Sequence, residues 1–381
     1  FIWFFQIALL DNTTIKMNVA SKKSVTIDPP FIFKNGSVFN DPITIVYETL
    51  GTLNAKKNNG ILVTTGLSPS AHIASSKADN SPGWWESIVG KDKPIDTNRY
   101  FVICVNSLGS CFGSSGPASN DPRSGQTYRL NFPEIGIEDI ASTIKPVIDD
   151  LGIETLKSIV GPSMGGMTAL SLIKQYPSIA NELVLISTAS SSRPFSIALR
   201  SLQRSMITSD PHWKKGNYSH SDLPLEGMKH ARFLGMITYR SPTEWNKRFG
   251  RKLIQNIAER ADLFGNRFQI QDYLKRRSDD FISDFDPNSY LYLSNAIDVF
   301  DFTEGSDDIE ETVASLDLDR VLIIGVDEDY IFPFQCQEDL YNAFVAKKFN
   351  ADLLKLPSIN GHDSFLVDHE SFGDALAKFY K

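Results

Sequence analysis

Short apolar runs alternate with helix-like patterns along residues 25–190. The runs consist largely of consecutive apolar side chains, which is typical of strands buried on both faces of a parallel sheet. They cover residues 43–49, 60–65, 100–105, 156–160 and 183–187. A helical pattern over residues 132–151 separates two of them, with Pro133 and Glu134 near its start, where the helix dipole favours an acidic side chain. This alternation predicts βαβ units, and therefore an α/β fold with a mostly parallel sheet and helices on both faces.

The pattern changes over residues 191–316. Helical periodicities dominate there, and runs typical of buried strands are missing; the helix-like segments are residues 195–207, 225–237, 242–251 and 290–300. Strand-like runs return at residues 321–326 and 351–356. We therefore predict one domain, whose first part is residues 25–190 and whose second part is residues 317–381. Residues 191–316 form a helical lid inserted over the carboxyl edge of the sheet.

The segment Gly161-Pro162-Ser163-Met164-Gly165 has the form G-x-S-x-G. The strand-like run 156–160 precedes it, and a helix-like run, 167–176, follows it. In this setting the motif forms a nucleophile elbow, a sharp turn that presents the serine at a helix N-terminus. Free backbone N–H groups at that position stabilise a developing oxyanion. Ser163 is therefore the candidate nucleophile.

A catalytic serine needs a histidine base, which in turn needs a carboxylate to orient it. In folds with this elbow the chain order is serine, acid, histidine. The run 321–326 ends in Asp327-Glu328-Asp329-Tyr330, and Asn360-Gly361-His362-Asp363 follows the run 351–356. Ser163, an acid near position 329 and His362 thus occur in the required order, each just after a strand.

Rival candidates are weaker. Most other histidines favour surface or structural roles: His212, His220, His230 and His369. His72 differs because it stands in an early loop close to the expected oxyanion loop. Gly109-Ser110-Cys111-Phe112-Gly113 resembles a cysteine nucleophile motif, but a Ser-, Gly- and Pro-rich segment follows it instead of a helix. We interpret Cys111 as part of a loop near the site.

Composition and charge narrow the class of protein. The chain has 381 residues, of which 41% are hydrophobic and 22% charged, as in ordinary globular proteins. A net charge of -8 argues against nucleic-acid binding. The three cysteines form no C-x-x-C pair, so neither a disulfide framework nor a zinc site is predicted, and a reducing compartment fits best. The ligand cluster that any bound metal would need is missing.

The first ten residues, 1–10, are strongly apolar but too few to span a bilayer. The sequence starts without methionine, and the first methionine is Met17. We interpret residues 1–16 as a non-native or disordered extension rather than an anchor. No other stretch approaches transmembrane length, so no membrane association is expected. The predicted location is the cytoplasm, with mitochondrial import as the alternative.

From about residue 40 the chain resembles the homoserine O-acetyltransferase family of the α/β-hydrolase fold, which also contains serine O-acyltransferases. The resemblance covers nearly the whole remaining chain as an ordered series of matches. These are residues 83–85, 94–97, 100–117, 161–167, 237–241, 248–251, 285–293 and 361–366.

The resemblance implies a catalytic triad of Ser163, Asp329 and His362. Asp329 matches the position of the family's catalytic acid, which precedes a Phe-Pro pair, here Phe332-Pro333. Asp327 is the alternative acid. It also implies an oxyanion hole made by the backbone N–H groups of Met164 and Leu67. The implied mechanism is ping-pong: Ser163 takes the acyl group from an acyl-CoA and passes it to the hydroxyl of an amino acid.

The resemblance also suggests residues that bind the amino acid. Arg204 stands at the family's arginine position in the first lid helix, and a guanidinium suits a carboxylate. Asp363, next to the catalytic histidine, is a candidate partner for the ammonium group. Tyr218 and Tyr239 are candidates for the same pocket. The family further implies a homodimer associated through the lid.

The sequence leaves two alternatives for the amino-acid substrate and two for the acyl donor. Thr168 replaces the glutamine that homoserine acetyltransferases typically carry, and residues 194–204 resemble the branch that acylates L-serine. The sequence therefore favours L-serine over L-homoserine, a difference of one methylene. It does not separate acetyl-CoA from succinyl-CoA as co-substrate, and it implies no permanently bound cofactor. Either amino acid would place the enzyme in cysteine or methionine biosynthesis.

Two other classes compete with the transferase. A serine esterase or other hydrolase would use the same triad but accept water in place of the amino acid. A non-enzymatic binding protein on this fold is disfavoured because Ser163, Asp329 and His362 are all present.

Overall fold

An eight-stranded sheet forms the centre of the molecule in the computed structural model, which describes residues 22–219, 221–254 and 263–381. Along the sheet the order is β1 (Lys23–Ile27), β4 (Ile43–Leu50), β8 (Phe101–Val105), β5 (Gly60–Thr64), β9 (Leu156–Pro162), β10 (Ala180–Ile186), β11 (Arg320–Val326) and β12 (Ala351–Leu356). The pairs β1–β4 and β4–β8 are antiparallel and the others are parallel. The predicted mostly parallel sheet is therefore confirmed.

The seven predicted strands are all present, with ends within a few residues of the expected positions. The sequence did not predict β1, because its residues alternate between exposed and half-buried positions and form no apolar run. Two short pairs lie outside the sheet: β2 (Phe31–Ile32) with β3 (Val38–Phe39), and β6 (Val89–Gly90) with β7 (Ile95–Asp96). The predictions for residues 1–16 and for His220 lie outside the described residues.

Helices cover both faces of the sheet, as predicted. Neighbouring residues of a buried strand serve opposite faces, so Leu183 and Val184 belong to two separate cores. One core contains the helices α1 (Ile137–Ser142), α2 (Ile144–Asp150), α3 (Met164–Gln175) and α10 (Phe334–Ala346). The other contains α12 (His369–Phe379) and the segment around the buried Trp85. The remaining short helices are α9 (Ile309–Ala314), α11 (Ser364–Val367) and the 3₁₀ turns Arg129–Asn131, Pro211–Gly216 and Gly361–Asp363.

The helix predicted over residues 132–151 is shorter and broken in two. It starts after Gly136, whose backbone N–H donates to the Asp139 carboxylate at 2.7 Å, so Pro133 and Glu134 precede the helix. The break falls at Thr143, between α1 and α2. Pro146 explains it, because proline has no N–H to donate to the carbonyl four residues earlier.

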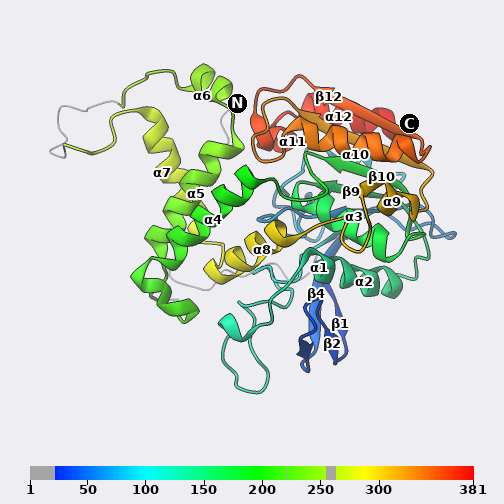
Figure 1. Cartoon of the computed structure of the whole chain (residues 1–381), viewed down its shortest axis with the longest axis horizontal. Coiled ribbons are helices and arrows are strands. Elements are labelled where there is room, and N and C mark those ends of the chain that lie inside the picture. Colours follow the sequence, from blue (N-terminus) through cyan, green and yellow to red (C-terminus); the bar gives the residue numbers. More distant parts are fainter. Residues whose placement is uncertain (1–21, 220, 255–262) are drawn as a thin grey trace.

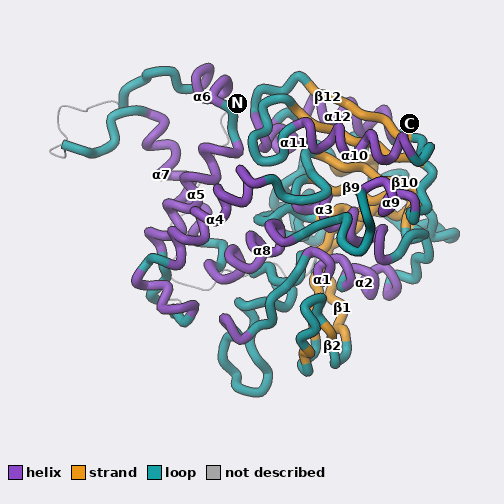
Figure 2. Tube along the Cα trace, viewed as in Figure 1, coloured by secondary structure: helices purple, strands orange, loops and turns teal. Residues whose placement is uncertain are grey.

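Within the described part of the lid the α-helices are α4 (Pro194–Thr208), α5 (Leu225–Tyr239), α6 (Pro242–Arg248), α7 (Gln269–Ile282) and α8 (Pro287–Val299). Figures 1 and 2 show them as a helical layer beside the sheet core. An antiparallel bridge between Ser191 and Asp301 joins the two ends of this insertion. Asp301 lies before the predicted boundary at 316, and α9 packs on α10. The predicted division of the chain at residues 191 and 316 stays a prediction.

Within the described ranges, no helix has the length and apolar character needed to cross a membrane.

Close packing of α3 against β5 depends on Gly165. A Cβ atom at this position would lie 2.4 Å from the backbone oxygen of Thr64, a distance that real Cβ contacts do not show. The Thr64 hydroxyl also donates to the Gly165 carbonyl at 2.7 Å, which fixes the two backbones together. The position of the α3 N-terminus over the sheet therefore requires glycine.

We expect Gly165→Ala to lower the free energy of unfolding by about 3 kcal/mol, since the backbone has to move to admit the methyl group. Gly66→Ala is the matched control: its Cβ would meet only the Pro69 side chain at 3.7 Å, an ordinary contact. Urea denaturation monitored by tryptophan fluorescence measures both. Equal stability of the two variants would contradict this account of the packing.

Candidate active site

Ser163 stands between β9 and α3, in the strand–turn–helix context that the sequence predicts. Its φ of 55° lies in a region that non-glycine residues rarely adopt, a strain that is typical of functional turns. Two hydrogen bonds hold the turn: the Ser163 N–H donates to the Ile186 carbonyl at 2.9 Å, and the Thr188 hydroxyl donates to the Ser163 carbonyl at 2.8 Å. The side chain is thereby presented at the first turn of α3.

The structure brings Ser163, His362 and Asp329 together. The distance from His362 Nε2 to Ser163 Oγ is 2.8 Å, and that from His362 Nδ1 to Asp329 Oδ2 is 2.7 Å. The other Asp329 oxygen accepts the backbone N–H groups of Ile331 and Phe332, at 2.9 and 2.8 Å. These bonds orient the buried carboxylate toward the imidazole, the arrangement that a serine nucleophile needs.

The alternative acid, Asp327, lies elsewhere. Its side chain is exposed and forms an ion pair with Lys355 at 2.6 Å. It therefore points away from the imidazole that Asp329 contacts.

His362 is buried and has a raised pKa. Burial by itself lowers the pKa of the imidazole, but the charge of Asp329 and its hydrogen bond outweigh that effect. The rings of Phe332, Tyr239 and Phe365 surround the imidazole at centroid distances of 5.4, 5.7 and 5.7 Å. These contacts fix the ring in the orientation that serves both Ser163 and Asp329.

Two backbone N–H groups are available near Ser163. Met164 is the first residue of α3, and Leu67 lies in the loop after β5. Neither N–H donates a hydrogen bond to any group within residues 22–219, 221–254 and 263–381. The sequence prediction that these two groups form an oxyanion hole needs free donors of this kind.

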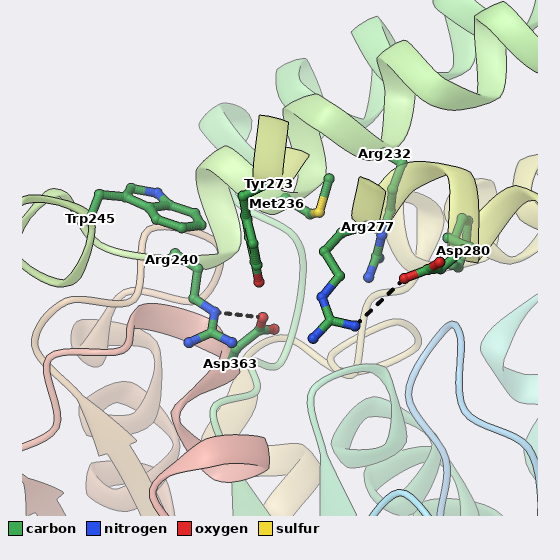
Figure 3. Close-up of a pocket in the computed structure, with 9 residues that line it drawn as sticks. Arg232, Met236, Arg240, Trp245, Tyr273, Arg277, Asp280 and Asp363 are labelled. Atoms are coloured by element: carbon green, nitrogen blue, oxygen red, sulfur yellow. Dashed lines mark hydrogen bonds and ion pairs between the residues drawn. The ribbon is translucent and has the colours of Figure 1, made fainter. Parts of the chain in front are cut away.

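A cavity of about 350 Å³ lies between the lid and the His362 loop. Figure 3 shows that its walls come from α5, α6, α7 and the residue next to the catalytic histidine. The lining residues are Arg232, Met236, Arg240, Trp245, Tyr273, Arg277, Asp280, Phe281 and Asp363. The lining therefore contains three arginines and two aspartates, and Arg240 also forms an ion pair with Glu244 at 3.9 Å.

Asp363 is held at the edge of this cavity by Arg240, whose Nε lies 3.0 Å from an Asp363 carboxylate oxygen. The end of α5 approaches the His362 loop closely because Gly361 has a φ of 69° and no side chain. A Cβ there would lie 2.7 Å from the Tyr239 carbonyl oxygen. The Ser241 hydroxyl adds a hydrogen bond to the Ile359 carbonyl. The lid is therefore attached directly to the loop that carries His362.

Sequence reasoning missed Arg232. Its guanidinium lies over the Phe281 ring at 4.4 Å, and its buried Nε has no hydrogen-bond partner among the described residues. A signal was present, because Arg232, Met236 and Arg240 follow each other at intervals of four and share one face of a helix. Only the structure shows that this face borders the cavity.

Arg204 lies outside the cavity lining and already has partners. It forms an ion pair with Asp298 at 2.7 Å and donates to the Ser294 hydroxyl at 2.9 Å. Asp298 also pairs with the buried Arg200 at 2.5 Å, so these charges join α4 to α8. The predicted role of Arg204 in binding a substrate carboxylate stays a prediction, and Arg204 shares the single carboxylate of Asp298 with Arg200.

The two tyrosines predicted for the substrate pocket occupy different surroundings. The Tyr218 hydroxyl donates to Asp286 at 2.6 Å, and Asp286 caps the N-terminus of α8, so Tyr218 supports the lid. Tyr239 lies beside the His362 ring and therefore borders the candidate site. The structure brings Tyr239, but not Tyr218, next to the triad.

The contacts of His72 and Cys111, the rival candidates from the sequence, indicate structural roles for both. His72 contacts Glu48 at 2.9 Å, and this hydrogen bond is the main reason why the pKa of His72 is raised to about 9. Burial raises the pKa of the Cys111 thiol to about 12, so it is not a thiolate at neutral pH. Its sulfur accepts the backbone N–H of Asp286 at 3.5 Å, which places it in a loop against the lid.

No group of three or more His, Cys, Asp or Glu side chains that could hold a metal ion occurs in the part of the chain that the structure describes.

Comparison with known proteins places this geometry in a family. A family model described as alpha/beta hydrolase fold matches residues 73–368. The chain is 46% identical over 361 residues to a serine O-succinyltransferase of Xanthomonas campestris pv. campestris, covering 92% of this chain and 95% of that protein. The chain belongs to the homoserine O-acetyltransferase family of the alpha/beta hydrolase fold. The resemblance and the fold class predicted from the sequence are thereby confirmed.

Other proteins similar to this chain differ in the activity that their names state. An L-serine/homoserine O-acetyltransferase of Streptomyces lavendulae is 48% identical over 340 residues, covering 88% of this chain and 91% of that protein. The structure of homoserine O-acetyltransferase from Bacillus anthracis superimposes with a TM-score of 0.85 at 26% identity, covering 94% of this chain and 96% of that one. The structure of esterase E22 superimposes with a TM-score of 0.84, also at 26% identity, over 94% and 100% of the two chains.

The raised pKa of His362 predicts the pH dependence of activity. A base must be unprotonated, and His362 is protonated below its pKa, so kcat/KM should rise with pH through an inflection above the ordinary value of 6.5. Asp329→Asn removes the charge that raises this pKa. We expect its inflection to move to lower pH and its rate to fall by roughly three to four orders of magnitude.

The control for this pH profile is Asp327→Asn, which alters the exposed alternative acid and should keep the wild-type profile. A wild-type inflection at or below 6.5, or a loss of activity in the Asp327 variant, would contradict the assignment of Asp329.

Proposed function

We propose that this chain is an acyl-CoA-dependent O-acyltransferase that acts on the hydroxyl group of L-serine or L-homoserine, in cysteine or methionine biosynthesis. The observation that carries the proposal is the Ser163–His362–Asp329 hydrogen-bond chain beside a lid-covered cavity with charges of both signs. An amino acid carries a carboxylate and an ammonium group, so its binding site needs positively and negatively charged side chains. The high identity to serine O-succinyltransferases and to a serine/homoserine O-acetyltransferase supports the same reading.

In the first half-reaction Ser163 becomes acylated. Its Oγ attacks the thioester carbonyl while His362 Nε2, 2.8 Å away, accepts the hydroxyl proton. The backbone N–H groups of Leu67 and Met164 stabilise the negative charge that develops on the carbonyl oxygen. The C–S bond then breaks, and the proton on His362 passes to the departing CoA thiolate.

In the second half-reaction the amino acid takes the acyl group. Its hydroxyl gives its proton to His362 and attacks the acyl-serine carbonyl, again with the oxyanion at Leu67 and Met164. The Ser163–acyl bond breaks, and the proton returns from His362 to Ser163 Oγ. Asp329 stabilises the imidazolium in both halves, which agrees with the raised pKa of His362.

Arg232 and Asp363 are the proposed partners of the amino acid's charged groups. The Arg232 Nε is buried without a partner in the described ranges, so a carboxylate in the cavity would satisfy it. Asp363 directly follows the catalytic base and would face the ammonium group. Arg232 is favoured here over Arg204, because Arg204 already forms an ion pair with Asp298 and a hydrogen bond with Ser294, whereas the Arg232 Nε has no partner among the described residues.

An esterase is the second candidate, and the close superposition on esterase E22 favours it. Water would then replace the amino acid in the second half-reaction, with the same triad. The two classes differ in whether turnover depends on an amino acid.

Two further properties belong to this proposal. A cytoplasmic location follows from the use of acyl-CoA, which is an intracellular metabolite. A homodimer through the lid is suggested by apolar side chains on the outer face of α4, where Phe195 and Leu202 are 59% and 49% exposed.

The first test measures free thiol release from acetyl-CoA and succinyl-CoA, each with L-serine and with L-homoserine. We expect release that depends on one of the amino acids and falls by about 10⁶-fold in Ser163→Ala, which lacks the nucleophile. Thiol release that is independent of any amino acid, or ester cleavage without transfer, would replace the transferase by a hydrolase.

A second test separates the amino-acid site from the acylation step. We expect Arg232→Gln to raise KM for the amino acid by roughly 10- to 100-fold, because a carboxylate loses its charged partner. Arg251→Gln is the control, since Arg251 also lies over an aromatic ring, that of Phe268, but does not line the cavity. Steady-state kinetics at varied amino-acid concentration give KM for each variant. An unchanged KM in Arg232→Gln would assign the carboxylate to another residue, such as Arg204.

A further inference from the structure

The loop after β5 carries the Leu67 N–H, one of the two proposed oxyanion donors, and side chains from other strands fix this loop just beyond Leu67. The Ala71 N–H donates to the side chain of Asn106, which follows β8. The next residue, His72, contacts Glu48 on β4, with 2.9 Å between Nδ1 and Oε2. The position of the Leu67 N–H therefore depends on anchors that lie outside the triad.

Both ring nitrogens of His72 face hydrogen-bond acceptors. Nδ1 faces the Glu48 carboxylate, and Nε2 lies 2.9 Å from the Ser81 carbonyl oxygen. The Ser81 hydroxyl is also close to Nε2, at 3.2 Å, but it donates its own proton to Asp79 at 2.6 Å. Only the protonated imidazolium has the two N–H groups that this arrangement requires.

The charges around His72 favour the same protonated form. The hydrogen bond with Glu48 is the main reason why the pKa of His72 is raised to about 9, and the charge of Asp79 acts in the same direction. Lys22 in turn acts on Asp79. Cys104, which pairs with Glu48 across β4 and β8, has a thiol pKa raised by burial and is therefore neutral. His72 is thus a cation at neutral pH.

Loss of the proton on His72 would break this anchor. The side chains of His72 and Glu48 are only 13% and 5% exposed, so water replaces little of the lost interaction. One ring nitrogen would face an acceptor without an N–H, and the buried carboxylate would lose the charge that balances it, which is costly. The loop is then released from β4 on the side next to Leu67.

We propose that protonated His72, held by Glu48, is a positioning residue that keeps the Leu67 N–H in place to stabilise the oxyanion when Ser163 is acylated. It acts through the loop and not by contact with the reacting atoms. This inference rests on the proposed oxyanion hole. Its consequence is a second limb in the pH profile: His362 must lose its proton for activity, whereas His72 must keep its proton.

The test follows acylation of Ser163 by p-nitrophenyl acetate across the pH range, without an amino acid. This ester has no group that titrates between about pH 5 and pH 10, so every inflection belongs to the enzyme. Stopped-flow detection of the released nitrophenolate gives the acylation rate constant and the dissociation constant of the ester separately. We expect the acylation rate constant of the wild type to fall above an inflection at about pH 9.

Glu48→Gln keeps the shape of the side chain and an oxygen that accepts the Nδ1 proton, but it removes the charge. We expect its alkaline inflection to move down by at least about one pH unit, while the inflection that belongs to His362 stays in place.

His72→Gln has no pair of N–H groups at the two ring positions. We expect it to lower the acylation rate constant at neutral pH by roughly 10- to 100-fold with an unchanged dissociation constant, because an oxyanion donor acts on the transition state. This variant and the wild-type profile decide the question even where Glu48→Gln does not fold.

Asp222→Asn is the matched control. Asp222 also contacts a histidine, His212, but these two side chains are 34% and 60% exposed and belong to the lid. We expect the wild-type profile in this variant. Ser163→Ala gives the background hydrolysis to be subtracted.

A purely structural role of the pair has a different signature. Because the pKa of His72 is raised from 6.5, the pair stabilises the fold fully below that pH and loses this contribution as the pH rises through about 9. Variants that unfold at lower temperature but keep the acylation rate constant and the alkaline inflection of the wild type would overturn the inference. A wild-type rate constant that stays level to about pH 10 would overturn it as well.

In both of these cases ester cleavage still depends on Ser163, so the proposed function stands. Ester cleavage that persists unchanged in Ser163→Ala would overturn the inference and the proposed function together.

Discussion

The two hydrogen bonds of the His362 imidazole are the interaction on which the rest of the site depends. They join Ser163 on the β9–α3 turn to Asp329 in the loop after β11, and these residues are far apart in the sequence. Parallel strands end at the same edge of the sheet, which is why three loops can meet there. His362 and Asp329 are buried, and the backbone donors of Ile331 and Phe332 keep the carboxylate in place.

The lid supplies the other half of the candidate site. It touches the catalytic loop where the end of α5 lies against Gly361, and Arg240 holds Asp363 beside the base. Its own helices are joined by buried charge, because Asp298 on α8 pairs with Arg200 on α4. A buried pair of this kind adds little net stability but favours one arrangement of the helices over others.

Charge distinguishes this cavity from a simple ester-binding cleft. A hydrolase needs room for an acyl group and water, neither of which calls for three arginines. A zwitterionic amino acid calls for side chains of both signs, and the lining of this cavity supplies both.

The sequence by itself determined the fold class, the strands of the parallel region and the order of serine, acid and histidine, because consecutive apolar residues and the G-x-S-x-G turn are local signals. It also determined the candidate acid, through the resemblance that selected Asp329 over Asp327. It did not predict α7, whose residues are mostly polar, or the break at Thr143. Only the tertiary structure decided which charges face the cavity: Arg204 pairs with Asp298 inside the lid, while Arg232 and Arg277 from two separate helices line the cavity. The physical reason is that the local sequence around a helical arginine is the same whether the side chain faces a cavity or a neighbouring helix. Its role depends on the partners that distant parts of the chain bring to it.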